Sequence, residues 1–126
     1  MEPYRTYVFN KSEKPKYSIV TPIYNQESII VKNVNSIIEK TDDFFEIILI
    51  LDFCFDKTEE NLLNYLDSLH NIRENLIQIR VFKNSEKPLF ETKCDNLGFR
   101  ESLGIYCLEI QADMEMTEQG YNQELR

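Results

Sequence analysis

Two carboxylates of the sequence stand just after apolar runs, where they could help to hold a metal ion. Asp52 follows the run Glu46–Leu51, and Asp113 comes shortly after the run Tyr106–Ile110. If both runs are parallel strands, the two acids lie at the carboxyl edge of a sheet, where open α/β sheets bind ligands and metals. The simpler alternative is that strands end at the surface, and that surface positions are often acidic in a chain of net charge −8. Spacing alone leaves both interpretations open.

The composition limits which partners the chain can bind. It contains 14 basic and 22 acidic side chains, and this balance opposes electrostatic binding to nucleic acid or to an anionic membrane. An anionic ligand would therefore need a bound cation or backbone N–H groups. Cys54, Cys94 and Cys107 form an odd set without metal-like spacing, so we expect free thiols in a cytoplasmic protein. No stretch is as apolar as a signal peptide or a transmembrane helix.

The segments that would position the two acids alternate between two sequence patterns, one typical of strands and one typical of helices. Strand-like runs cover 17–23, 46–51, 76–82 and 105–110, and helical periodicity covers 26–40, 58–69 and 92–103. This order predicts right-handed crossovers and a mostly parallel sheet with helices on both faces. We therefore expect one doubly wound α/β domain over residues 1–126.

Several local expectations accompany this architecture. The run 76–82 alternates apolar and polar side chains, which predicts a less buried, edge-like strand. Pro22 is expected to end the ladder of the first strand, because proline has no N–H to donate. Asn25 and Asp56 are predicted to cap the first and second helices.

Four sequence features, in order, resemble the nucleotide-sugar-binding half of family 2 glycosyltransferases, which have the GT-A fold. They lie in YSIVTPIYNQE, FEIILILDFCFDKTEE and DNLGFRESLGIYCLEIQADM. In the family, one strand ends in T-P-x-Y-N and the next in an acidic pair followed by D-x-T. A helix with N-x-G and a later glycine then leads to the metal-binding D-x-D. Asn96, Gly98, Gly104 and Asp113 keep that spacing, and the resemblance covers about residues 17–115.

The resemblance implies a binding site for a nucleoside diphosphate sugar. The nucleotide-binding residues it implies are Thr21, Pro22, Tyr24, Glu27, Asp52, Asn96, Gln111 and Ala112. Asp52 matches an acid that accepts a hydrogen bond from the base, typically N3–H of uracil, so a UDP-sugar is the favoured donor. Asp113 matches the last acid of D-x-D and would hold Mn²⁺ or Mg²⁺ against the diphosphate, whose negative charge grows as it leaves.

The chain departs from the family pattern at several of these positions. Gln111 replaces the first aspartate of D-x-D, which keeps an oxygen but removes a charge, so weaker or altered metal binding is expected. Leu51 replaces the first acid of the second strand's pair, and the bulky segment Phe53–Phe55 replaces a small turn. Asp95 stands where many relatives have a basic residue. These changes weaken the expectation that the base is uracil.

Three functions remain open from the sequence. The first is an inverting glycosyltransferase of hexosyl type that transfers sugar to an acceptor hydroxyl. Relatives continue for about as many residues again and carry the acceptor site and catalytic base there, so we expect a chain that lacks this half. The second is a non-catalytic nucleotide-sugar-binding module or remnant. The third is a Mg²⁺-binding receiver or flavodoxin-like domain, disfavoured because Thr21 and Pro22 stand where receivers have paired acids. Self-association through an exposed sheet edge or apolar face is also expected.

Overall fold

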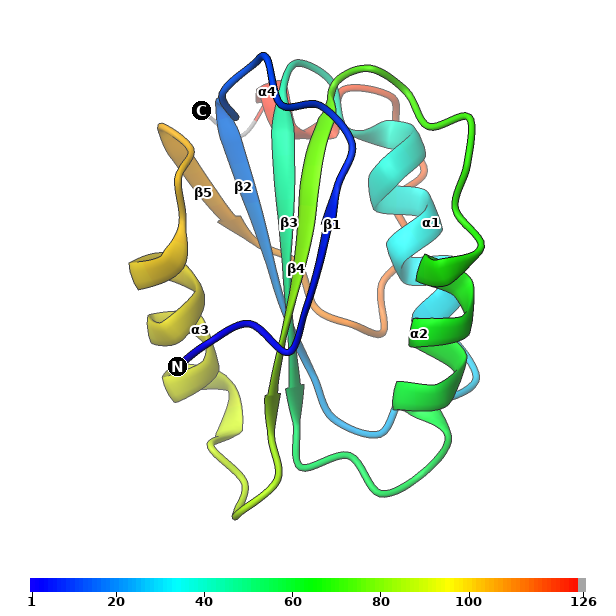
Figure 1. Cartoon of the computed structure of the whole chain (residues 1–126), viewed down its shortest axis with the longest axis vertical. Coiled ribbons are helices and arrows are strands. Elements are labelled where there is room, and N and C mark those ends of the chain that lie inside the picture. Colours follow the sequence, from blue (N-terminus) through cyan, green and yellow to red (C-terminus); the bar gives the residue numbers. More distant parts are fainter. Residues whose placement is uncertain (125–126) are drawn as a thin grey trace.

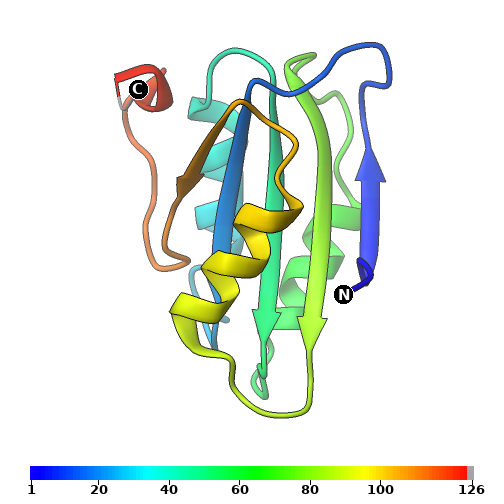
Figure 2. The same cartoon turned by 90° about the vertical axis from the view of Figure 1, so that its left-hand side faces the viewer.

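The computed structural model describes residues 1–124 and contains a five-stranded sheet with helices on both faces (Figure 1). Its strands are β1 (Arg5–Val8), β2 (Tyr17–Ile23), β3 (Phe45–Asp52), β4 (Leu76–Asn84) and β5 (Tyr106–Glu109). Its helices are α1 (Ile30–Lys40), α2 (Thr58–Asp67), α3 (Phe90–Glu101) and α4 (Tyr121–Glu124). Helices α1 and α2 cover one face and α3 covers the other (Figure 2). The predicted doubly wound α/β architecture is confirmed.

The strand order is β1-β4-β3-β2-β5, in which β1 alone runs antiparallel to its neighbour. The prediction that β4 is an edge strand is wrong, because β1 pairs along its outer side. The polar side chains of β4 instead meet a buried acid. Gln78 Nε2 and Arg80 Nη2 each donate to Glu46 Oε1 over 3.1 Å. Their alternation with apolar residues therefore reflects an internal polar network and not contact with solvent.

Most of the apolar core lies between the sheet and helices α1 and α2, and a smaller cluster lies beneath α3. Strand β3 is buried along its whole length, as its unbroken apolar run predicts. Helix α3 approaches β2 so closely that a Cβ built on Gly98 would lie 2.2 Å from Val20 Cγ1. A Cβ on Gly104 would lie 2.8 Å from Ser18 N. Gly98 and Gly104, the two glycines of the family-like spacing, therefore lie where the chain packs too closely to leave room for a side chain.

The segments between strands and helices differ in detail from the expectations. Helix α1 begins at Ile30, and Asn25 does not cap it. Asn25 has φ 46° and accepts hydrogen bonds from the N–H groups of Phe55 (3.0 Å) and Asp56 (3.4 Å). The N-cap of α2 is Lys57, although Asp56 Oδ1 still accepts the N–H of Thr58 at 2.9 Å. Asn25 therefore joins the loop after β2 to the loop after β3.

Pro22 ends only one of the two ladders that β2 forms. On the β5 side, the paired residues stop at Val20 opposite Glu109. On the β3 side, pairing continues through Pro22 to Ile23. The missing N–H of Pro22 therefore coincides with the place where the chain after β5 separates from β2, and this separation leaves room for a cavity.

The outer surface near β5 carries exposed apolar side chains. Leu103 is 63% exposed and Ile105 is 78% exposed. Self-association through this edge stays a prediction. Within residues 1–124, no helix combines the length and apolarity that a membrane crossing needs.

Candidate functional site

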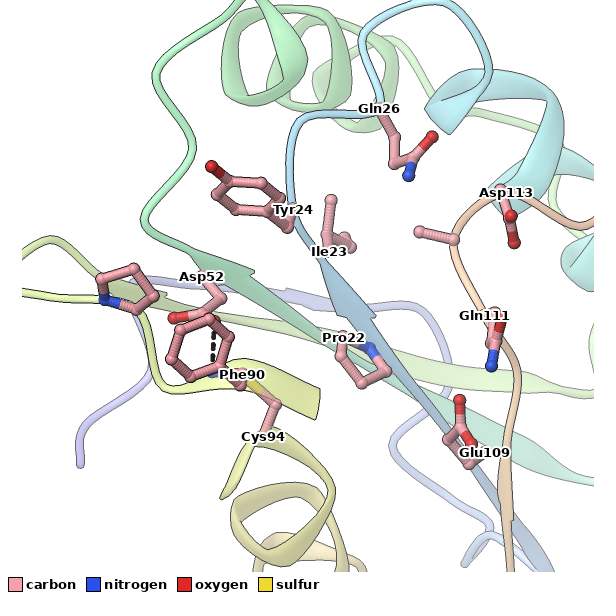
Figure 3. A pocket seen from close by; sticks show the side chains of 12 residues that line it. Pro22, Ile23, Tyr24, Gln26, Asp52, Phe90, Cys94, Glu109, Gln111 and Asp113 are labelled. Carbon is pink, nitrogen blue, oxygen red and sulfur yellow. Dashed lines mark hydrogen bonds between the residues drawn. The ribbon is translucent and has the colours of Figure 1, made fainter. Parts of the chain in front are cut away.

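A cavity of about 350 Å³ opens at the carboxyl ends of β2 and β3, beside the chain that follows β5 (Figure 3). Its volume falls within the range of about 300–1,000 Å³ that small-molecule sites occupy. It is lined by Pro22, Ile23, Tyr24, Gln26, Asp52, Pro88, Phe90, Cys94, Glu109, Gln111, Ala112 and Asp113. The parallel topology therefore brings together segments that are far apart in sequence.

The cavity gathers most of the residues that the sequence analysis implicated. Those that line it are Pro22, Tyr24, Asp52, Gln111, Ala112 and Asp113. Within the described chain, Thr21, Glu27 and Asn96 lie outside this lining. Thr21 is fully buried and alternates with Pro22 across the sheet, so the two side chains point to opposite faces. Glu27 and Asn96 are exposed, on the loop after β2 and on α3 respectively. The nucleotide contacts of these three residues stay predictions.

Asp52 is buried, and its carboxylate holds the start of α3. Oδ1 accepts hydrogen bonds from Leu89 N at 2.8 Å and from Asn84 Nδ2 at 2.9 Å. Oδ2 accepts hydrogen bonds from Phe90 N at 2.8 Å and from Leu89 N at 3.1 Å. A carboxylate at a helix N-terminus also interacts favourably with the helix dipole. The structure thus gives Asp52 a positioning role that the sequence did not predict, and recognition of a base by Asp52 stays a prediction.

The segment that carries Gln111 and Asp113 is held by helix α1. Asn33 is fully buried, and its Nδ2 donates to the carbonyl oxygens of Gln111 (3.0 Å) and Met114 (2.7 Å). Ser36 Oγ accepts the N–H of Met116 at 2.8 Å. The sequence does contain a signal for Asn33, because this polar residue lies on the apolar stripe of the helix. Such a residue is expected to bond to something in the interior.

Replacing Asn33 by leucine should lower the free energy of unfolding by about 1–3 kcal/mol, because the two partly buried hydrogen bonds from its amide to the carbonyl oxygens of Gln111 and Met114 are lost. The same variant should bind metal-dependent ligands more weakly, since Asp113 loses its support. Urea denaturation measures the first effect. Lys32→Ala, at an exposed position of the same helix, is the control and should change stability by less than about 0.5 kcal/mol. Equal stability of the two variants would contradict the role given to Asn33.

The thiols of the chain are free, as predicted, and poorly suited to nucleophilic catalysis. Cys94 lines the cavity, and burial raises its pKa to about 12, with the negative charge of Asp52 adding to the shift. Burial also raises the pKa of Cys54. Because the thiolate is the reactive form, these shifts oppose a nucleophilic role for Cys54 and Cys94 at neutral pH.

The cavity offers oxygen donors that fit a divalent cation shared with a phosphate ligand. Within the described chain, no group of three or more His, Cys, Asp or Glu side chains could hold a metal ion. Asp113, Glu109 and Gln111 nevertheless line the same cavity. Mg²⁺ typically takes one or two protein carboxylates, while waters and substrate phosphates complete its shell. This donor set fits a cation that binds together with a diphosphate.

The described fold is shared with much longer proteins of known structure. S. aureus TarS matches with TM-score 0.67 and 22% identity over 87% of this chain and 19% of TarS. A TarS fragment in complex with UDP-GlcNAc matches with TM-score 0.67 and 22% identity over 86% of this chain and 29% of the fragment. The mannosyltransferase PcManGT of Pyrobaculum calidifontis, in complex with GDP-Man and Mn²⁺, matches with TM-score 0.71 and 14% identity over 86% of this chain and 30% of PcManGT. The chain thus spans less than a third of each.

The family is shown by the sequence match and not by these structural likenesses, whose low identities establish only the fold. No curated protein matches the chain significantly. The model of Glycosyl transferase family 2 matches residues 18–123, which include all but the first residue of β2, the strands β3 to β5 and the whole lining of the cavity. The chain therefore belongs to glycosyltransferase family 2 and has the GT-A fold of its nucleotide-binding half.

Proposed function

We propose that the cavity binds the nucleoside diphosphate part of a sugar donor, for an inverting hexosyltransferase that moves the sugar to an acceptor hydroxyl. One observation carries this proposal: Tyr24, Asp52 and Asp113 come from three separate strand ends and line one cavity. Structures with the same fold hold UDP-GlcNAc or GDP-Man. The sequence resemblance favours UDP as the nucleotide.

Asp113 is proposed to hold Mn²⁺ or Mg²⁺, with Gln111 as a neutral oxygen donor beside it. A cation bound there would neutralise the negative charge that develops on a leaving diphosphate. An anionic diphosphate needs a cation here for two reasons. Glu109 places a carboxylate in the same cavity, and the chain as a whole has a net charge of −8, so both repel the ligand. With Gln111 in place of an acid, we expect weaker metal binding than a site with two carboxylates would give.

Binding without transfer is the second candidate function. Asp52 already accepts hydrogen bonds from Leu89, Phe90 and Asn84, and Asp113 is assigned to the cation. Two of the three carboxylates in the cavity lining thus have other roles, which leaves Glu109 as the remaining candidate for accepting a proton from an attacking hydroxyl. Transfer assays separate the two candidates: a chain that only binds should show nucleotide affinity without sugar transfer to any acceptor.

The donor site is tested by thermal unfolding with UDP, GDP, CDP or ADP, each with and without Mn²⁺. One nucleotide should stabilise the protein only when Mn²⁺ is present, because Asp113 alone cannot hold an anion. A ligand at a hundred times its dissociation constant adds about 2.7 kcal/mol, which shifts Tm by several degrees in a domain of this size.

Asp113→Ala should abolish this shift. Glu115→Ala is the matched control, because it removes a charge from an exposed acid of the same segment and should keep the shift. If no nucleotide stabilises the protein, the donor-site proposal fails. If both variants keep the shift, nucleotide binding stands and the metal role of Asp113 fails.

A further inference from the structure

The cavity is bordered by two exposed aromatic side chains, each preceded in sequence by a residue that packs against the apolar core. Phe90 is 73% exposed, whereas Leu89 packs against the apolar cluster beneath α3. Tyr24 is 49% exposed, whereas Ile23 is fully buried. A large apolar ring that is left out of the core beside a cavity is available to a ligand.

The backbone holds the ring of Phe90 in this place at a conformational cost. Phe90 has φ 63°, a left-handed value that residues with a side chain rarely adopt. The buried carboxylate of Asp52 accepts its N–H at 2.8 Å and that of Leu89 at 2.8 Å. Asn84 Nδ2 donates both to Asp52 and to the carbonyl of Lys87. Such strain persists only where the surrounding structure imposes it, and it is concentrated at ligand sites.

Tyr24 is supported from the side by a second ring. Its ring centroid lies 5.9 Å from that of Phe55, at an interplanar angle of 77°. This contact gives Phe55, in the bulky segment after β3, a structural role. In the view of Figure 3, the rings of Tyr24 and Phe90 lie on the two sides of the Asp52 carboxylate. The Tyr24 ring and the backbone of Phe90 are thus held by contacts that involve no ligand.

We propose that Phe90 is a binding residue for the nucleoside base, which it contacts by stacking on the side of the cavity opposite Tyr24. This inference rests on the nucleotide site proposed above and adds to it the residue that holds the base. Aromatic side chains stack on any base, because every base has a π-face. Phe90 should therefore contribute affinity for nucleosides in general, while hydrogen bonds decide between one base and another.

A single tryptophan can report this contact, because the chain contains none. In Phe90→Trp, a nucleoside diphosphate with Mg²⁺ should quench the emission excited at about 295 nm, whereas pyrophosphate with Mg²⁺, which has no base, should not. Phe99→Trp is the matched control. Phe99 is also exposed, at 46%, and lies on the same helix but outside the cavity lining. Its tryptophan should respond to neither ligand.

Affinity gives an independent test. Phe90→Ala should weaken nucleoside diphosphate binding by roughly tenfold and leave pyrophosphate binding unchanged. Phe90→Leu, which keeps an apolar side chain without a ring, should lose nearly as much. If the nucleotide binds the wild type and the alanine variant equally well, or if the tryptophan of Phe90→Trp does not respond, Phe90 does not hold the base and the nucleotide site itself still stands. If no nucleotide binds the wild type, both proposals fail together.

Discussion

Replacing Glu46 by alanine is expected to lower the free energy of unfolding by about 3–5 kcal/mol, because it leaves a buried cation without its main partner. Glu46 is fully buried in the middle layer of the fold. Its Oε1 accepts from Arg80 Nη2 and Gln78 Nε2, each at 3.1 Å. Its Oε2 accepts from Ser18 Oγ at 2.6 Å and from Leu103 N at 2.7 Å.

The hydrogen bonds around Glu46 also hold in place the part of the chain that leads to the candidate site. Ser18 Oγ, which donates to Glu46, accepts the N–H of Gly104 at 2.8 Å. The turn between α3 and β5 is thereby held against β2, and β5 leads directly to the segment of Gln111 and Asp113. Loss of Glu46 should therefore disturb nucleotide binding as well as stability.

Urea denaturation of Glu46→Ala, Glu46→Gln and Glu101→Ala tests this expectation. Glu101 also meets Arg80, at 3.6 Å, but its side chain is 27% exposed, so its loss should cost less than about 1 kcal/mol. Glu46→Gln should fall between the two, because an amide keeps the shape but replaces one accepting oxygen with a donor. If Glu46→Ala costs no more than Glu101→Ala, the network is not a main source of stability.

The parts of the fold that could be predicted from the sequence are those that follow from the spacing of apolar residues and from the order of the strands and helices. Apolar runs and helical stripes located β2 to β5 and α1 to α3, and chirality then implied a parallel sheet covered on both faces. Strand β1 escaped prediction because its four residues carry little pattern of their own and are ordered by pairing with β4. The same pairing explains the mistaken edge position of β4. Alternating polar residues look alike in sequence whether they face water or a buried carboxylate.

The candidate site was predictable where a motif covered it. The family-like spacing implicated Tyr24, Asp52 and Asp113, and the structure brings all three to one cavity. Phe90 and Asn33 could not be found in this way. Phe90 reaches the cavity through an unusual backbone angle, which sequence patterns do not report. Asn33 acts through two carbonyl groups about eighty residues away, which only the tertiary structure reveals.

Replacing Asp52 by alanine is expected to cost about 3 kcal/mol in unfolding free energy, because hydrogen bonds to a charged group contribute about 1.5–3 kcal/mol each and three partly buried donors lose this acceptor together. The donors are the N–H groups of Leu89 and Phe90 and the side-chain amide of Asn84. Unfolding in urea without ligand measures this effect directly. An unchanged unfolding free energy would show that the carboxylate does not hold the start of α3.

The same variant distinguishes two ways in which Asp52 can influence nucleotide binding. If Asp52 reads N3–H of uracil, Asp52→Ala should weaken binding of UDP much more than of CDP, which has no such group. If Asp52 acts by holding Phe90 against the cavity, both nucleotides should lose the same factor. The second expectation also requires the two residues to be coupled, so the affinity loss in Asp52→Ala/Phe90→Ala should be smaller than the sum of the single losses. Additive losses would mean that the residues contribute independently, and the distorted backbone at Phe90 would then need another explanation.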